Sequence, residues 1–226
     1  MDTVVFGRDG ETELLFVLGF RARIGGANEQ WFISRLTDAG YRVHVVELPT
    51  NITDFNAQYR DPVQRYHDEH EPAIVLGHSL GGLVAAHLDT DAKRVYLAPW
   101  WGIYGEKLMT WETVVIPRLP IKAEIIAASI ERGDLGEHVS DAEFDRLTKR
   151  VSPALITAVY NAQQARPSID ESAVVFASLR ETVVSLRAIG EAVSTDQLRI
   201  YDGAHIPYAS ANRQATTDEI LATLTA

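Results

Sequence analysis

A serine between two glycines is the feature of this sequence best suited to chemistry. It lies in the run Gly77-His78-Ser79-Leu80-Gly81, which follows a short apolar stretch typical of a strand and precedes a stretch typical of a helix. In that setting a Gly-x-Ser-x-Gly run predicts a serine nucleophile on a sharp strand-to-helix turn. The glycines are expected where side chains would collide with the strand and the helix, and the strained backbone lifts the hydroxyl clear of the sheet. The alternative is a glycine-rich turn whose serine is passive.

The same turn offers a group that stabilises negative charge. The backbone N–H of Leu80 lies at the N-terminus of the predicted helix, where the helix dipole favours an anion. It is therefore a candidate oxyanion donor for a carbonyl carbon attacked by Ser79.

The motif and the order of the predicted elements resemble the α/β-hydrolase superfamily over nearly the whole length of the chain. The resemblance implies an α/β fold of the α/β-hydrolase type, with a mostly parallel, twisted sheet of eight strands flanked by helices. It also implies a catalytic triad in the chain order nucleophile, acid, histidine, with Ser79 as the first member.

The family's histidine follows the last strand, and His205 follows the predicted strand Leu198–Tyr201. The resemblance therefore implies that His205 is the general base. The remaining histidines precede or adjoin the nucleophile, or lie in the predicted cap: His44, His67, His70, His78, His87 and His138.

The family's acid follows the strand after the cap, in a pattern like Gly-x-x-Asp-x-x-Val. The matching stretch is Ser178-Leu179-Arg180-Glu181-Thr182-Val183-Val184, which has Glu181 at the Asp position and serine in place of the glycine. The resemblance therefore implies that Glu181 orients the imidazole. In the alternative, Glu181 is a surface residue, and the acid is either missing or one of three aspartates: Asp170, Asp196 and Asp202.

The loop after the first long strand holds the family's second oxyanion donor. It reads Leu18-Gly19-Phe20 where the family often has His-Gly-x. The expected donor is the backbone N–H of Phe20, and each such donor is worth roughly 3 kcal/mol of barrier. The next residues include Arg21 and Arg23, which either hold a substrate carboxylate or phosphate or are solvated or paired with surface carboxylates.

Large side chains crowd the start of the predicted cap, where they either line an acyl or aryl pocket above the nucleophile or fasten the cap to the sheet. They are Trp100, Trp101, Tyr104, Met109 and Trp111.

No cofactor and no metal are predicted. His67 and His70 have the helical i, i+3 spacing of metal ligands, but no third ligand follows at a recognisable spacing. The sequence contains neither a glycine-rich phosphate loop nor a dinucleotide fingerprint.

Strand-like runs that alternate with helix-like stretches predict the α/β sheet that positions these residues. Strands are expected at Thr3–Phe6, Glu13–Gly19, Tyr41–Leu48, Ala73–Leu76, Arg94–Leu97, Ala173–Ala177 and Leu198–Tyr201. Helices are expected from Asn28 to near Gly40, around Gln58–His70, from the nucleophile to about Leu88, and from about Thr217. Asp9-Gly10 predicts a hairpin turn after the first strand.

A long segment separates the strand that ends near Leu97 from the one that starts near Ala173. It has helical character and no clear strand. Because so long an excursion is unusual between the strands of one sheet, we expect a helical cap at residues 101–172, inserted into one domain of residues 1–226.

The charge balance limits the partners of this protein. Asp and Glu total 31 against 21 Lys and Arg, so the formal net charge is −10. Nucleic-acid binding is not expected, because phosphate contacts need clustered positive charge. Only four of the basic residues are lysines. Such a composition fits either an ordinary acidic enzyme or, as we slightly favour, a halophilic protein whose self-repulsion is screened by salt.

The remaining composition favours a cytoplasmic protein. There is no cysteine, which excludes disulfides and thiolate metal sites. No apolar run approaches the ~20 residues of a membrane span, and the first residues do not resemble a secretory signal. We therefore expect no membrane insertion. The oligomeric state is left open.

These features favour an esterase that transfers the acyl group of a small or medium carboxylic ester to water through an acyl-enzyme. One alternative is thioester cleavage, carbon–carbon hydrolysis or lyase chemistry on an anionic substrate that Arg21 and Arg23 would bind. The other is a binding protein of the same fold without catalysis.

Overall fold

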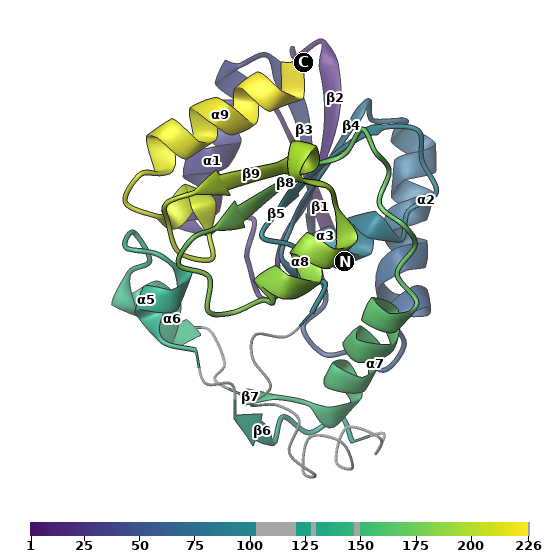
Figure 1. Cartoon of the computed structure of the whole chain (residues 1–226). Coiled ribbons are helices and arrows are strands. Elements are labelled where there is room, and N and C mark those ends of the chain that lie inside the picture. The colour runs from purple at the N-terminus through teal and green to yellow at the C-terminus, as the bar shows by residue number, and fades with distance from the viewer. Residues whose placement is uncertain (103–120, 128–129, 147–149, 226) are drawn as a thin grey trace.

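The structure is a computed structural model that describes residues 1–102, 121–127, 130–146 and 150–225. Within this part of the chain, a twisted sheet lies between two layers of helices (Figure 1). No helix in the described residues is both long and apolar enough to cross a membrane.

Seven strands form the main sheet in the order β1-β3-β2-β4-β5-β8-β9. Their bounds are β1 Asp2–Phe6, β2 Thr12–Val17, β3 Tyr41–Glu47, β4 Ile74–His78, β5 Lys93–Leu97, β8 Val174–Ser178 and β9 Leu198–Tyr201. Every neighbouring pair is parallel except β1 with β3. The predicted α/β-hydrolase-type sheet is therefore confirmed, with seven of the eight strands that the resemblance implied found among the described residues.

The predicted hairpin after the first strand is wrong. β1 pairs antiparallel with β3, whereas β2 lies between β3 and β4. The chain still turns there, with the N–H of Gly10 donating to the carbonyl of Gly7. The burial pattern gives the physical reason: β2 becomes fully buried toward its end and needs a neighbour on both sides, whereas the largely exposed β1 suits the sheet edge.

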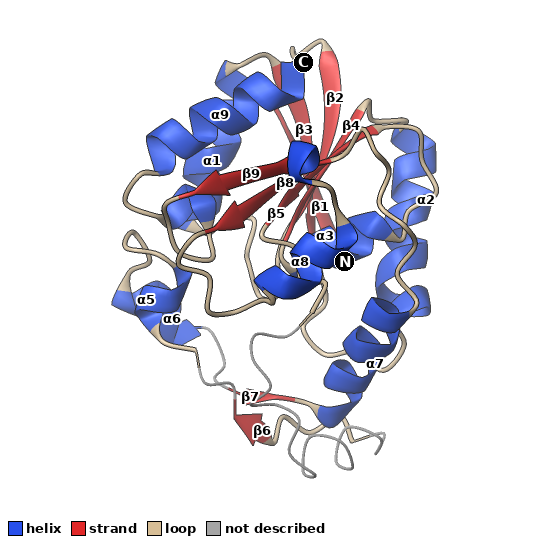
Figure 2. Ribbon diagram, in the orientation of Figure 1, coloured by secondary structure: helices blue, strands red, loops and turns tan. Residues whose placement is uncertain are grey.

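Helices cover both faces of the sheet (Figure 2). Alternate side chains of β2 separate the two faces: Leu15 and Val17 pack with α3, whereas Leu14 and Phe16 pack with α1 and α9. The bounds are α1 Ala27–Asp38, the π-helix η1 Asn56–Arg60, α2 Asp61–His70, α3 Leu80–Ala86, α8 Leu186–Ala192, the 3₁₀ turns η4 Thr195–Gln197 and η5 Pro207–Ala209, and α9 Arg213–Thr225.

The insertion between β5 and β8 holds three helices in its described parts. They are α5 Arg132–Leu135, α6 Asp141–Arg146 and α7 Pro153–Gln164. The last begins at a capping serine, since the Oγ of Ser152 accepts the N–H of Leu155 at 3.1 Å. The insertion also contains a two-stranded ribbon that was not predicted, β6 Ile126–Ala127 antiparallel to β7 Arg150–Val151. Strands of two residues are too short to leave a periodic pattern in the sequence.

The topology brings three distant segments to one edge of the sheet. β4, β8 and β9 run parallel or share parallel neighbours, so their carboxyl ends point the same way. In open α/β sheets this edge is where ligands bind. The residues that follow these strands include Ser79, Glu181 and His205.

Candidate active site

Ser79 occupies a strained turn between β4 and α3. Its backbone has φ 51° and ψ −117°, a region that non-glycine residues rarely adopt and that costs about 1–3 kcal/mol. The surrounding backbone holds it there: the N–H of Ser79 donates to Leu97 at 3.0 Å, and its carbonyl accepts from Trp100 at 2.9 Å.

The glycines of the motif are required by the neighbouring backbone, as the sequence predicted. A Cβ at Gly77 would lie 2.8 Å from the carbonyl oxygen of Gly81, and a Cβ at Gly81 would lie 2.6 Å from the carbonyl oxygen of Leu18. Real Cβ atoms do not approach that closely. The glycines thus let α3 leave the sheet directly after Ser79, which orients the hydroxyl away from the strand.

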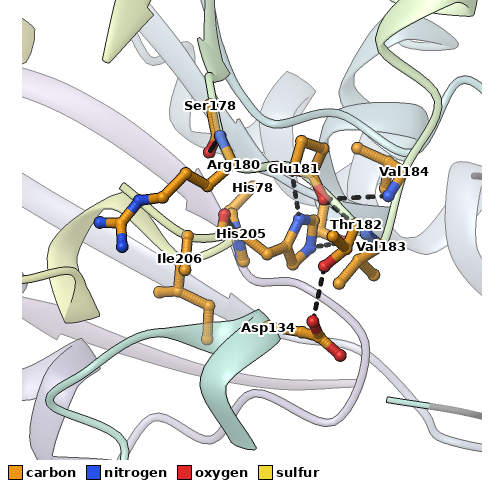
Figure 3. A network of polar contacts seen from close by, with 12 residues as sticks. His78, Asp134, Ser178, Arg180, Glu181, Thr182, Val183, Val184, His205 and Ile206 are labelled. Atoms are coloured by element: carbon orange, nitrogen blue, oxygen red, sulfur yellow. Dashed lines mark hydrogen bonds and ion pairs between the residues drawn. The ribbon is translucent and has the colours of Figure 1, made fainter. Parts of the chain in front are cut away.

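Ser79, His205 and Glu181 form one continuous hydrogen-bonded relay. Ser79 Oγ lies 2.9 Å from His205 Nε2. His205 Nδ1 lies 2.9 Å from Glu181 Oε2 (Figure 3). All three residues are buried, with exposed fractions of 6%, 4% and 4% for Ser79, His205 and Glu181. The sequence analysis predicted these three residues as a triad, and the structure brings their side chains together.

Glu181 is held as a carboxylate with a fixed orientation. Its Oε1 accepts the backbone N–H groups of Val183 at 2.7 Å and Val184 at 3.0 Å, which leaves Oε2 for His205. Burial acts to raise the pKa of the Glu181 carboxyl, but the charge and hydrogen bond of His205 and these two N–H donors lower it, and the net shift is below its ordinary value.

Two of the three aspartates considered as alternative acids have other partners for their carboxylates. Asp170 accepts from Ser172, and Asp202 pairs with Arg180 at 3.1 Å. Asp196 lies in η4, where its carbonyl accepts from Arg199.

Two buried hydroxyl groups fix the backbone around His205. The phenol of Tyr201 donates to the carbonyls of Ala204 at 2.9 Å and His205 at 3.2 Å. The hydroxyl of Ser210 accepts the N–H of Ala204 and donates to the carbonyl of Ile206, so it links the residues on either side of the histidine. The sequence analysis missed Ser210, because a lone serine five residues after a histidine carries no recognisable signal.

A second histidine lies beside the relay and stays neutral. Burial, followed by the charge of His205, lowers the pKa of His78 to about 3. Its ring centroid lies 5.1 Å from that of His205. Neutral His78 accepts from the phenol of Tyr208 through Nδ1 and donates from Nε2 to the carbonyl of His205, both at 3.4 Å.

The backbone segments that carry the two candidate oxyanion donors lie near Ser79 in space. Leu80 is the first residue of α3, so its N–H has no partner within the helix. Phe20 follows Gly19, and a Cβ at Gly19 would lie 3.2 Å from the Cβ of Ser79. The loop after β2 therefore passes directly against the nucleophile and turns there, since Ala22 N–H donates to the carbonyl of Gly19.

The two loop arginines pair with carboxylates of the chain. Arg21 is buried and in the left-handed conformation, and its Nη2 contacts Glu124 of the insertion at 2.6 Å. The exposed Arg23 pairs with Glu47. To reach a substrate anion, either guanidinium would have to share or release its present partner.

Two of the aromatic residues predicted at the start of the cap, Trp100 and Trp101, are described by the structure. Trp101 is buried against Tyr96, with ring centroids 4.9 Å apart, and its Nε1 donates to the carbonyl of Gly82. Trp100 is half-buried, and its carbonyl accepts from Gln163 of α7. The other predicted pocket residues, Tyr104, Met109 and Trp111, lie outside the described residues.

The two histidines considered as metal ligands have other contacts. His67 Nε2 lies 2.7 Å from the hydroxyl of Thr90, and His70 stacks on Tyr66. The described part of the chain contains no group of three or more potential metal ligands.

Comparison with known proteins points to one family. A model of the alpha/beta hydrolase family matches residues 14–218. No curated protein matches the chain in sequence.

Solved structures share the fold at low sequence identity. The chain is similar to monoacylglycerol lipase of Paleococcus ferrophilus, with a TM-score of 0.76, 15% identity, and coverage of 99% of this chain and 97% of that one. It is similar to a soluble variant of monoglyceride lipase from Saccharomyces cerevisiae, with a TM-score of 0.76, 12% identity, and coverage of 99% and 91%. An esterase from Exiguobacterium antarcticum gives a TM-score of 0.65 at 11% identity, with coverage of 99% and 95%.

Proposed function

This chain belongs to the alpha/beta hydrolase family, and from that premise we propose that it is a serine hydrolase that cleaves a carboxylic ester of small or medium size through an acyl-enzyme. The observation that carries the proposal is the buried relay in which one imidazole bonds both Ser79 Oγ and Glu181 Oε2 at 2.9 Å. A nucleophile, a base and an orienting acid in this arrangement match the geometry of acyl-transfer enzymes.

In the first half of the reaction, His205 Nε2 takes the proton of Ser79 as Oγ attacks the ester carbonyl carbon. The carbonyl oxygen gains negative charge, which the N–H groups of Phe20 and Leu80 stabilise. His205 then gives the proton to the leaving alcohol as the carbon–oxygen bond breaks, and the acyl group remains on Ser79.

In the second half, water replaces the alcohol. His205 takes a proton from water as the water oxygen attacks the acyl carbon, and returns the proton to Ser79 as the carboxylic acid leaves. Throughout, Glu181 accepts the Nδ1–H of His205, which keeps Nε2 directed at the serine and stabilises the imidazolium.

The ester as substrate is supported by what the similar folds are called: two are lipases of monoglycerides and one is an esterase. In thioester cleavage, carbon–carbon hydrolysis or lyase chemistry on an anionic substrate, Arg21 would bind the negative charge of the substrate. Arg21, however, already pairs with Glu124 at 2.6 Å. We therefore propose an ester as the substrate. Substrate binding by Arg21 is part of the proposal only for an anionic substrate.

In the same proposal, residues 101–172 are a cap over the sheet edge within one domain. Two contacts support this role: Arg21 of the loop after β2 pairs with Glu124, and Gln163 of α7 donates to the carbonyl of Trp100. Trp100 and Tyr104 are the residues we propose for the acyl pocket, with Trp101 fastening the cap.

The proposal is tested by steady-state kinetics on 4-nitrophenyl esters of increasing acyl length and on acyl-CoA thioesters. We expect turnover to be fastest on the short and medium esters and to disappear in Ser79→Ala. Preference for the thioesters would favour the anionic alternative. Folded wild-type protein that turns over neither class of substrate faster than Ser79→Ala does would favour a binding role.

A further inference from the structure

One segment of the insertion contacts both loops that carry the relay. This segment, residues 131–139, is called the brace here. It lies between the acid loop, residues 179–185, and the base loop, residues 202–212. Figure 1 shows α5, which belongs to the brace, on the side of the sheet toward which the arrows of β8 and β9 point.

The brace binds the base loop through the main chain. The N–H of His205 donates to the carbonyl of Asp134 at 3.0 Å, and the next N–H, of Ile206, donates to the carbonyl of Leu135 at 2.9 Å. In return, the N–H of His138 donates to the carbonyl of Ala209 at 2.8 Å. The backbone of the general base is therefore hydrogen-bonded directly to the insertion.

Asp134 of the brace also binds the acid loop, through its side chain. Asp134 Oδ1 accepts the hydroxyl of Thr182, the residue after Glu181, at 2.8 Å (Figure 3). Its other oxygen, Oδ2, accepts the N–H of Glu131 at 2.7 Å in a capping box that fixes the turn. Asp134 thus reaches the neighbour of the acid with its side chain and the base itself with its carbonyl.

A second carboxylate of the brace repeats this bridge on the outer side. Glu137 Oε1 accepts from Arg180 of the acid loop at 2.8 Å, and Oε2 accepts the N–H of Ala211 of the base loop at 2.8 Å. Because Arg180 and Glu137 are both largely exposed, their ion pair contributes less than about 1 kcal/mol. The contacts of Asp134 reach closer to the relay, because they join the residue after Glu181 and His205 itself.

Apolar packing closes the space between the polar contacts. Leu135 and Val139 of the brace form a small cluster with Ala209, against which Val183 of the acid loop and Ile206 of the base loop pack. Gly136 permits the close approach of the two chains, because a Cβ there would lie 2.5 Å from the carbonyl oxygen of Ala209.

We propose that Asp134 is a positioning residue for the Glu181–His205 pair, and that the Thr182–Asp134 hydrogen bond sets the distance between the acid and the imidazole. The inference rests on the proposed function. Hydrolysis depends on that distance because a misplacement of 1 Å costs about 10²-fold in rate. Other links join the two loops, including Arg180 to Asp202 and Ser178 to Gly203, so losing the Thr182 bond loosens the pair rather than separating it.

The test removes one hydroxyl at an exposed position. Thr182→Val deletes the donor and keeps the shape, and Thr182→Ser keeps the donor. The control, Thr157→Val, makes the same deletion in α7, where the hydroxyl donates to the carbonyl of Pro153 in its own helix. On 4-nitrophenyl butyrate we expect Thr182→Val to lower kcat about tenfold with little change in KM, below the cost of a full 1 Å shift. Thr182→Ser and Thr157→Val should stay within about twofold of the wild type.

The pH profile separates positioning from a loss of folded protein. An imidazolium that is less well paired with its carboxylate gives up its proton more easily. The acidic limb of kcat/KM in Thr182→Val should therefore move to lower pH, whereas partial unfolding would lower the whole curve without moving it. In a double-mutant cycle, Thr182→Val should cost much less in the Asp134→Ala background than in the wild type, because the Thr182 hydrogen bond is already absent there. Asp134→Ala alone should cost more than Thr182→Val, since it also removes the capping hydrogen bond to Glu131.

Two results would overturn the inference and leave the proposed function standing: wild-type kcat and an unmoved acidic limb in Thr182→Val, or full additivity with Asp134→Ala. A wild-type protein that neither hydrolyses the ester nor reacts with a fluorophosphonate would contradict the proposed function itself, and the positioning role with it.

Discussion

At the residue scale, the chemistry depends on the protonation state of each titratable group in the site. Glu181 is kept ionised by His205 and two backbone donors, and His78 is kept neutral by burial. The first group can stabilise a positive imidazolium, and the second adds no competing positive charge beside it. That Ser79, Glu181 and His205 lie together was predictable from the sequence, because each follows a predicted strand in the order that the family resemblance implied. Ser210 and Asp134 were not, since their contacts join segments that no local pattern connects.

Replacing the acid by its amide should abolish most turnover while keeping the fold. In Glu181→Gln, Oε1 still accepts from Val183 and Val184, but an NH₂ group faces His205 Nδ1 and favours the wrong tautomer. We expect kcat to fall by about 10³–10⁴-fold, measured on a 4-nitrophenyl ester, with an unchanged circular dichroism spectrum. The control is Glu191→Gln, which removes an exposed carboxylate paired with Arg187. Near-normal turnover in Glu181→Gln would assign the orienting role to another group.

Neutral His78 makes stability depend on pH. Its pKa is about 3 in the folded protein against an ordinary value of 6.5, so between these pH values the unfolded chain binds a proton that the native state does not. Stability should therefore be complete above pH 6.5 and fall as the pH is lowered, with a contribution of up to about 1.4 kcal/mol per pH unit. In His78→Asn the slope of unfolding free energy against pH, from urea titrations at pH 5 to 7, should be shallower. An identical slope would mean that His78 is protonated in the folded state.

At the element scale, the strand-to-helix turn is where local sequence determined the structure most directly. Its glycines match a close approach of backbone to backbone, which only glycine permits. The pairing of β1 was mispredicted because it is not determined by local sequence. A turn signal at Asp9-Gly10 reports that the chain reverses, but the partner of β1 is chosen by burial of the whole sheet.

Alanine at Gly81 should destabilise the protein, whereas alanine at another helical glycine should not. A Cβ at Gly81 meets the backbone of β2, and overpacking of this kind costs about 1–3 kcal/mol or more. At Gly190 of α8, which is exposed and has nothing within 4 Å of a Cβ, alanine should stabilise by about 0.5–1 kcal/mol. Urea denaturation of both variants measures the difference. Equal stabilities would show that the turn has room to relax.

At the scale of the whole molecule, the sequence predicted the sheet architecture but not the contacts of the insertion. The alternation of strands and helices made the architecture predictable from the sequence. The contacts of the insertion with the acid and base loops were not predictable, because they join residues about 50 to 70 positions apart with no periodicity between them.

The formal charge of −10 predicts that salt stabilises the fold. The Debye length falls from about 10 Å at 0.1 M salt to about 3 Å at 1 M, which screens repulsion among surface carboxylates. If the acidic, lysine-poor composition reflects halophily, the melting temperature should rise steadily from 0.1 M to 2 M KCl. A melting temperature that is indifferent to molar KCl would leave an ordinary acidic protein.

The central claim is that His205 activates Ser79, and covalent labelling with a fluorophosphonate followed by peptide mass spectrometry tests it most directly. We predict one adduct on Ser79 in the wild type, none in Ser79→Ala, and markedly slower labelling in His205→Ala. Folded wild-type protein that stays unlabelled in both dilute buffer and molar salt, or that carries its adduct on another residue, would contradict the account.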